Sequence, residues 1–171
     1  MTRTPTAELD EPYSGPDASP VSWARATESL DAAEVYWLST VRPDGRPHVT
    51  PVAAVLLEGS LYFSTGQFEQ KAHNLEKNSH CIITTGCNTF YEGLDIVVEG
   101  DAIRTTDKST LERLTELFAK KYDDTFGFKV GDDGFVHEHG AAHVFGVAPV
   151  KAFGYERTRD PRLGSATRYR F

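Results

Sequence analysis

Residues 35–52 read VYWLSTVRPDGRPHVTPV, two apolar runs separated by a short polar segment. The segment at 42–47, RPDGRP, holds an Asp-Gly pair, which is a strong signal for the turn of a β-hairpin. The second run continues to residue 58 as a nearly continuous apolar strand. Pro51 inside it predicts a bulge or a sheet edge, because proline cannot donate a hydrogen bond to the ladder. This stretch therefore predicts an antiparallel pair of strands.

Further strands are expected on both sides of this hairpin, with helices inserted between them. The expected strands are LYFST (61–65), HCIITTG (80–86), LDIVVEGDAIRTT (94–106, bent at Gly100), AAHVFGVAPVKAFGYER (141–157) and ATRYRF (166–171). One helix is expected to begin with Ser19 as its N-cap, and another with the capping box STLE at 109–112. The apolar stripe of the second helix is Leu111, Leu114, Leu117, Phe118 and Tyr122. Strands joined mostly by short turns predict a mainly β chain, an antiparallel barrel with peripheral helices.

Length and composition indicate one domain. The chain has 171 residues, 39% hydrophobic and 25% charged, which is typical of a globular protein. Residues 1–18 are rich in Pro, Thr, Asp and Gly and are expected to form a flexible arm, leaving 19–171 as a single domain. The sequence has no long apolar run and no signal-peptide pattern, so we expect a cytoplasmic protein without a membrane partner.

The charge is uneven along the chain. The net charge of −7 argues against nucleic-acid binding. Residues 1–34 hold seven acids and two bases, whereas residues 151–171 hold six bases and two acids. The basic end predicts either a local anion site or a solvated arginine tail. In the last strand, period-2 alternation places Arg168 and Arg170 on one face and Tyr169 on the other. We expect this C-terminal strand to serve binding more than folding, with one face packed and the arginine face presenting positive charge.

The stretch LYFSTGQFEQKAHNLEKN, residues 61–78, predicts a short strand that runs directly into a helix. On a helical wheel, Phe68, Ala72 and Leu75 share the face that would dock on the barrel. Lys71 and Asn74 fall on one flank of this face. On the other side, Glu69 and Glu76 are expected to point away.

This helix start offers two interpretations. Ser64 and Thr65 precede the helix, and Lys71 lies in its first turn. Hydroxyl groups, free N–H groups at a helix N-terminus and an ammonium group are the components of a phosphate site. An ordinary helix start with a snorkelling lysine is the alternative, and the spacing alone favours it slightly.

A series of motifs resembles a known family. STVRPDGRPHVTPV, GSLYFSTG followed by QKAHN, IVVEGDAIR and the final ATRYRF occur in the order and spacing of the pyridoxamine 5′-phosphate oxidase-like split β-barrel superfamily. Within it, the chain is most similar to the flavin and deazaflavin (F420) oxidoreductases. The resemblance covers roughly residues 20–171 and implies an FMN-binding split barrel.

The resemblance also implies where a cofactor would bind. It implies a homodimer with two cofactor sites at the subunit interface. Residues like Ser64, Thr65 and Lys71 would bind the cofactor phosphate, and Asn74 would support the helix. The other implied site residues are His48, Val49, Thr50, Pro51 and Val52 along the flavin-type ring, Gln70 at the helix start, and Arg168, Tyr169 and Arg170 on the C-terminal strand.

The chain departs from the family pattern at several of these positions. Gln70 and His73 stand where close relatives have arginines, and Ala53 and Leu56 stand where aromatic residues are frequent. A site with fewer cations is less suited to the polyanionic tail of F420 than to the single phosphate of FMN. We therefore expect FMN, with F420 as the alternative. A degenerate or repurposed site is a further possibility.

No other motif indicates catalysis. HEHGAAH at 137–143 is not H-E-x-x-H, so surface histidines are expected and no metal site. We name no catalytic side chain, because in a cofactor enzyme the protein supplies binding and orientation. The sequence thus predicts an oxidoreductase that passes hydride to or from a small organic substrate. The alternative is a non-catalytic protein that binds or carries flavin, haem or another tetrapyrrole on the same fold.

Overall fold

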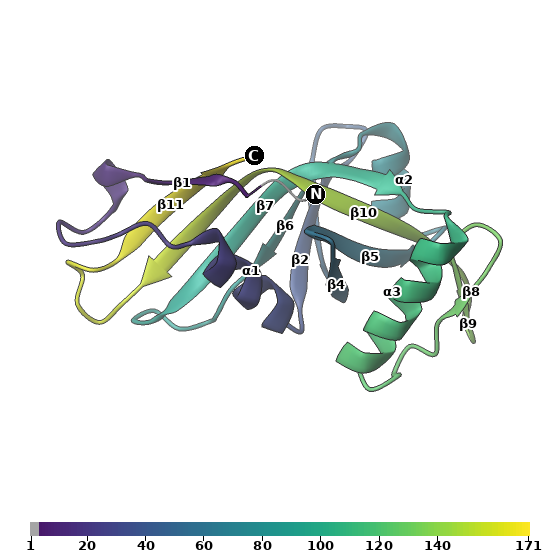
Figure 1. The fold of residues 1–171 in the computed structure, drawn as a ribbon. Helices are drawn as coiled ribbons and strands as arrows, with labels where there is room; N and C mark the ends of the chain where they lie inside the picture. Colours follow the sequence, from purple (N-terminus) through teal and green to yellow (C-terminus); the bar gives the residue numbers. More distant parts are fainter. Residues whose placement is uncertain (1–3) are drawn as a thin grey trace.

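The computed structural model describes residues 4–171. They form an antiparallel β-sheet system with three α-helices and one short 3-10 helix (Figure 1). In chain order the elements are β1 (Thr6–Leu9), η1 (Glu11–Tyr13), α1 (Trp23–Ala32), β2 (Tyr36–Val41), β3 (Pro47–Val52), β4 (Ala54–Leu57), β5 (Ser60–Gly66), α2 (Gln70–Lys77), β6 (His80–Thr85), β7 (Gly93–Arg104), α3 (Lys108–Lys121), β8 (Lys129–Val130), β9 (Phe135–His137), β10 (Gly140–Arg157) and β11 (Ser165–Arg170). Within this described part, no helix is long and apolar enough to cross a membrane.

The long strand β10 organises the sheet. One of its edges pairs with β7, and the other pairs first with β5 and then with β11. The register shifts between Pro149 and Lys151, where β10 changes partner. Opposite this shift, a Cβ on Gly100 would come within 2.5 Å of the Ala148 carbonyl oxygen, so only glycine fits. The sheet curls without closing, and the predicted mainly β, antiparallel split barrel with peripheral helices is confirmed.

The predicted hairpin is present, and the apolar strand after it is divided in two. β2 and β3 pair across the turn that contains Gly45, whose φ of 86° is the left-handed conformation that glycine favours. The strand is interrupted at Ala53. Before this residue β3 pairs with β2, and after it β4 pairs with β5. β3 lies at the end of the strand order, as the position of Pro51 predicted. One apolar run of sequence therefore supplies two strands, one paired with β2 and the other with β5.

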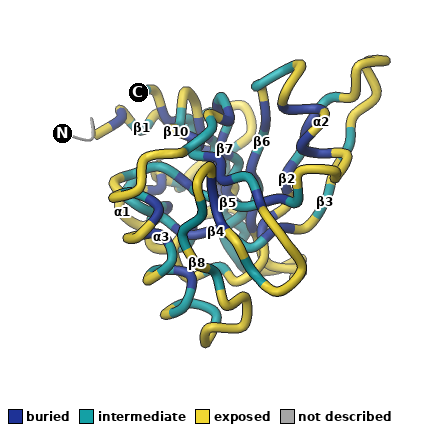
Figure 2. Tube along the Cα trace, turned by 90° about the vertical axis from the view of Figure 1, so that its right-hand side faces the viewer, coloured by how far each residue is buried: buried dark blue, intermediate teal, exposed yellow. Residues whose placement is uncertain are grey.

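Two clusters of buried side chains form the core. Figure 2 marks the buried residues in dark blue along the trace. The larger lies inside the curled sheet under α1 and includes Leu30, Phe63 and Tyr169. The smaller lies between α3 and β4, β5 and β10. The predicted stripe of α3 is confirmed: Leu111, Leu114 and Phe118 are buried, and Leu117 and Tyr122 pack beside them.

Both predicted helix starts were misplaced by two or three residues. The N-cap of α1 is Ser22 rather than Ser19, and the N-cap of α3 is Asp107 rather than Ser109. In each helix the capping side chain accepts a hydrogen bond from the N–H group three residues later. Several capping residues lie close together in both segments, and the packing of the buried stripe selects one of them.

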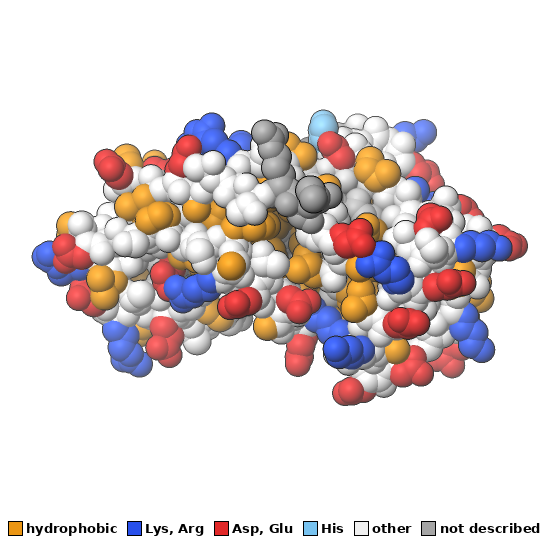
Figure 3. Space-filling view, in the orientation of Figure 1, with side chains coloured by type: hydrophobic (Ala, Val, Ile, Leu, Met, Phe, Trp, Pro, Cys, Tyr) orange, Lys and Arg blue, Asp and Glu red, His pale blue; other side chains and the backbone are white. Residues whose placement is uncertain are grey.

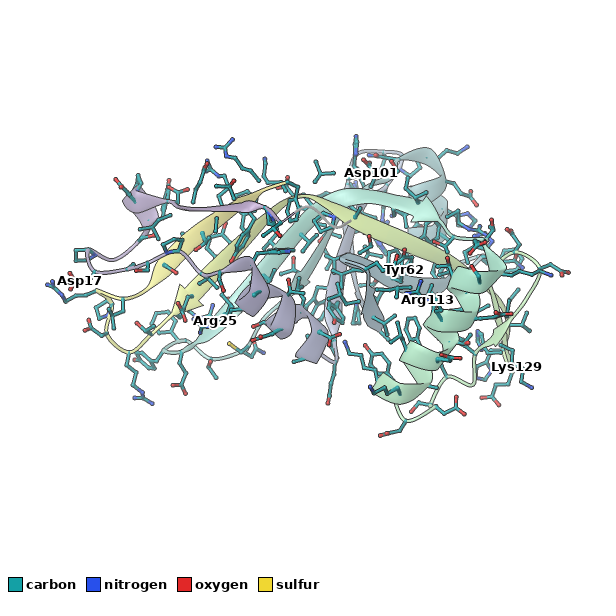
Figure 4. All side chains as sticks on the ribbon, viewed as in Figure 1. Asp17, Arg25, Tyr62, Asp101, Arg113 and Lys129 are labelled. Atoms are coloured by element: carbon teal, nitrogen blue, oxygen red, sulfur yellow. The ribbon has the colours of Figure 1, made fainter. Side chains whose placement is uncertain are left out.

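Part of the predicted arm is regular structure. Of residues 1–18, residues 1–3 lie outside the described part, and β1 pairs with β11 at the sheet edge. Three ion pairs connect the two ends of the chain: Glu8 with Arg170, Asp10 with Arg168, and Asp17 with Arg162. Acidic and basic side chains therefore mix over this end of the molecule, with Asp17 at its outer tip (Figures 3 and 4). Three of the six basic side chains of residues 151–171 are therefore paired with the acidic arm, which partly neutralises the basic end within one chain.

Candidate functional site

Residues 66–69, between β5 and α2, turn the chain sharply and are called the α2 turn below. β5 ends at Gly66, and the N–H of Glu69 bonds back to the Gly66 carbonyl at 3.1 Å. α2 packs on β2 and β5 and buries Lys71, Ala72, Asn74 and Leu75. Phe68, expected to dock, is 83% exposed, because it lies in the turn before the helix begins.

The Glu69 carboxylate occupies the centre of this turn. It accepts a hydrogen bond of 2.8 Å from the Gly66 N–H and pairs with the ammonium group of Lys71. The expectation that Glu69 points away is wrong. Its ψ of 150° is extended, so the helical wheel does not describe its direction. Lys71 is 8% exposed, whereas the Glu69 side chain is about half-exposed.

The electrostatics agree with this geometry. Partial burial acts to raise the pKa of the Glu69 carboxyl. The hydrogen bonds from Lys71, the Gly66 N–H and Thr65 outweigh burial, and the pKa lies below its usual range. An anion at this point is therefore stabilised by donors from the end of β5 and from α2.

A hydrogen-bonded chain of side chains connects α2 to the hairpin. The amide of Gln70 donates to the Asn74 oxygen at 2.8 Å, and the amide of Asn74 donates to the Thr40 hydroxyl at 2.9 Å. The Thr40 hydroxyl lies 3.4–3.5 Å from the carbonyl oxygen and Nδ1 of His48. Asn74 is fully buried, and this contact fits the supporting position that the resemblance implies. Gln70 is held by Asn74.

β3 divides its predicted site residues between two faces. His48, Thr50 and Val52 alternate with the more exposed Val49 and Pro51. Val52 belongs to the core, and the buried Thr50 hydroxyl has no hydrogen-bond partner in the described chain.

His48 lies within electrostatic reach of the α2 turn. Burial lowers the pKa of the His48 imidazole, and the charges of Arg42 and Lys71 lower it further. At neutral pH the imidazole is therefore uncharged and available for a hydrogen bond.

Ser64 and Thr65 point to opposite faces of β5. Thr65 is buried and pairs in register with His143, on the face where Phe63 stacks on Phe145. Ser64 pairs with Val144, which belongs to the cluster under α3. Within one chain, therefore, Thr65 shares the face of the α2 turn and Ser64 faces the cluster under α3, although the resemblance implied that both hydroxyls bind the phosphate.

Sequence reasoning missed His143 and Arg104. His143 pairs in register with Thr65, and Arg104 pairs with Phe145, two residues further along β10, on the other edge of that strand. The buried atoms His143 Nδ1 and Arg104 Nε have no hydrogen-bond partner in the described residues. Burial and the Arg104 charge lower the pKa of His143. No local signal connects these residues to the helix start, because only strand pairing brings them together.

The C-terminal strand lies far from the α2 turn within one chain. β5 and β11 pair with the same strand, β10, but Gly66 lies opposite Ala142 and Arg170 opposite Lys151, nine positions further on, which is roughly 30 Å along an extended strand. Arg168 and Arg170 are paired with acids of the N-terminal segment. Tyr169 is fully buried, and its hydroxyl donates to the Val21 carbonyl at 2.9 Å. Its side chain is a core element and offers no surface to a ligand.

A wide groove lies at this other end of the sheet. Its volume is about 1050 Å³, and its lining includes Tyr13, Phe90, Phe153, Tyr155 and Arg157. Arg157, on β10, forms an ion pair with Asp95 of the neighbouring strand β7. The groove was not predicted, because its walls come from η1, the β6–β7 loop and the β10–β11 hairpin.

Comparisons with known proteins agree on one family and one fold. The model of the pyridoxamine 5′-phosphate oxidase family matches residues 22–154. The structure of a conserved hypothetical protein from Mycobacterium tuberculosis is similar, with a TM-score of 0.67 and 17% identity over 84% of this chain and 89% of that one. No curated protein matched the chain.

Two further similar structures have names that mention a cofactor. A FAD-binding protein from Mesorhizobium loti has a TM-score of 0.60 and 14% identity, covering 98% of this chain and 99% of that one. An F420 reductase has a TM-score of 0.53 and 20% identity, covering 73% and 93%. At these identities the likeness shows the fold.

Proposed function

The chain belongs to the pyridoxamine 5′-phosphate oxidase family, and from this membership we propose that it is an oxidoreductase that binds FMN. The observation that carries the proposal is the anion already held at the α2 turn. The Glu69 carboxylate stands in for a phosphate, since it draws together the Gly66 N–H and the buried Lys71 ammonium. A phosphate group uses donors of the same kind at a helix start.

The donor set fits a single phosphate better than a polyanionic tail. Of the side chains around the turn, Lys71 supplies the positive charge, while Gln70 is engaged with Asn74 and His73 is exposed. This favours FMN over F420. The names of two similar structures, a FAD-binding protein and an F420 reductase, support a flavin-type ligand on this fold.

The bound flavin would supply the hydride chemistry, and the chain would bind and orient it. Lys71, the Gly66 N–H and Thr65 would hold the phosphate. His48 and the unpartnered Thr50 hydroxyl lie on the face of β3 toward α2, where they would offer polar contacts to the rest of the cofactor. The substrate is a small organic molecule.

Spectra of the purified protein and titrations test this proposal. We expect FMN, released by denaturation or added to the apo-protein, to bind more tightly than F420. Reduction of the bound flavin by NAD(P)H, followed by its reoxidation, would support the enzyme. A tightly bound but inert chromophore would support a carrier instead, and failure to bind either cofactor would contradict the proposal.

We further propose that the protein is a homodimer that uses the outer face of its sheet. Cross-strand register aligns one row of side chains there: Pro51, Trp37, Thr84, Val97, Phe153 and Arg168. Trp37 and Val49 on this face are 51% and 52% exposed. An exposed apolar sheet face of this extent is typical of an interaction surface. If the C-terminal strand contributes to a cofactor site, it must be β11 of the second copy, because β11 of the same chain lies far from the α2 turn.

A Trp37→Glu variant is expected to be monomeric, because it replaces the exposed aromatic side chain of this row with a charge. Light scattering should give about twice the 18.9 kDa chain mass for the wild type and the single mass for the variant. Val136→Glu, at a 43% exposed position on β9, is the control and should remain dimeric. A monomeric wild type at micromolar concentration would contradict the dimer.

A further inference from the structure

We propose that Glu69 is a built-in competitor of the cofactor phosphate and sets the affinity of the site for phosphate-bearing ligands. This inference rests on the proposed function, because it concerns the same α2 turn. It goes further by assigning a role to Glu69, an acidic side chain at a proposed phosphate site.

The competition follows from shared donors. Glu69 takes the Gly66 N–H at 2.8 Å and the Lys71 ammonium, the two strongest donors that the turn offers. A phosphate bound there would need the same donors and would place a second negative charge beside the carboxylate. The two anions therefore exclude each other, and binding requires Glu69 to leave.

The structure also allows Glu69 to leave. Its side chain is about half-exposed, and the described contacts of its carboxylate are all with the turn itself. Lys71 differs, because only 10% of its side chain is exposed and it cannot turn into solvent. Glu69 thus acts as the movable partner and Lys71 as the stationary one. In the absence of a ligand, Glu69 pairs with the Lys71 ammonium group, whose burial without a partner would destabilise the fold.

Two variants of Glu69 test the proposal by direct binding. Glu69→Gln removes the charge but can keep the bond to the Gly66 N–H, whereas Glu69→Ala removes both contacts. We expect the FMN affinity to rise about five- to tenfold in Glu69→Gln, because FMN no longer has to break a half-exposed ion pair or bind beside a second negative charge. In Glu69→Ala the affinity should rise at least as much. Without a ligand, both variants should melt at a lower temperature, because Lys71 loses its partner.

Two controls separate the phosphate effect from other effects. Riboflavin, which lacks the phosphate, should bind the wild type and both variants equally. Glu76→Gln makes the same chemical change on the exposed side of the same helix and should leave the FMN affinity unchanged. An unchanged or weaker FMN affinity in both Glu69 variants would overturn the proposal, as would an equal gain for riboflavin. If the wild type and the Glu69 variants bind neither FMN nor F420, the proposed function itself fails.

Discussion

A Lys71→Met variant is expected to bind FMN about ten- to a hundredfold more weakly than the wild type. Lys71 is 8% exposed and is the cation of the α2 turn, so its loss removes one charge-assisted hydrogen bond to the phosphate. Such a bond contributes about 1.5–3 kcal/mol, which corresponds to this range of affinity. Methionine keeps the apolar stem of the side chain in place. Fluorescence titration of the apo-protein with FMN measures the change.

Lys77→Met on the same helix is the control. Lys77 is exposed in the last turn of α2, and its replacement should change the FMN affinity little. F420 should lose affinity in parallel with FMN, since both ligands carry a phosphate. Equal binding by the two variants would show that the helix start does not hold a phosphate.

The burial of Lys71 also bears on stability. A snorkelling lysine, the alternative that the sequence offered, would lie at the surface, and its loss would leave the apo-protein unaffected. In the structure it is buried against β2 and β5, so Lys71→Met changes an interior contact. Glu69 is half-exposed and can turn to water once its partner is absent. Binding must therefore be compared under conditions where both variants are fully folded.

A Tyr169→Ala variant is expected to lower the free energy of unfolding by about 3–5 kcal/mol, the usual effect of removing a buried aromatic side chain. Tyr169 is fully buried, and its ring contacts Trp23 edge-on at 4.9 Å. Its hydroxyl donates to the Val21 carbonyl at 2.9 Å, and burial raises its pKa to about 12. The substitution would leave a cavity between β11 and α1. Denaturant unfolding at a fixed protein concentration measures the effect.

Tyr13→Ala is the matched control, because Tyr13 is 80% exposed and the same atoms are removed. Its stability should stay within about 0.5 kcal/mol of the wild type. Tyr169→Phe should cost about 1–3 kcal/mol, since it removes only the bond to Val21 and leaves that carbonyl unsatisfied. A Tyr169→Ala protein as stable as the Tyr13→Ala protein would contradict the assignment of β11 to the core. The last strand is thus expected to matter strongly for folding, contrary to the sequence-based expectation.

The local sequence determined those elements whose pattern repeats within a few residues. The Asp-Gly pair predicted the β2–β3 hairpin because Gly45 alone can easily take the positive φ of this turn. The 3.6-residue period from Leu111 to Tyr122 identified the buried face of α3. In β11 the period of two separated Arg168 from Tyr169 correctly. Each of these patterns is set by backbone geometry that needs no distant partner.

The candidate site could be predicted as a region, though not as a set of contacts. The lysine and hydroxyls around the start of α2 were apparent from the sequence. The direction of Glu69 was not, because it precedes the first helical residue, Gln70, and its extended backbone follows the turn. Ser64 and Thr65 must point to opposite sides of a strand, but only the packing on each side decides which of them meets the helix.

The tertiary structure alone decided which distant segments lie together. Residues 6–9 pair with residues 167–170, and Asn74 reaches Thr40 across 34 positions of chain. Such contacts leave no local pattern, because a strand's alternation is the same whichever neighbour it pairs with. The pairing is selected by the summed burial of the whole sheet, to which each short segment contributes a small part. For this reason only the tertiary structure pairs three acids of the N-terminal segment with arginines of the C-terminal one.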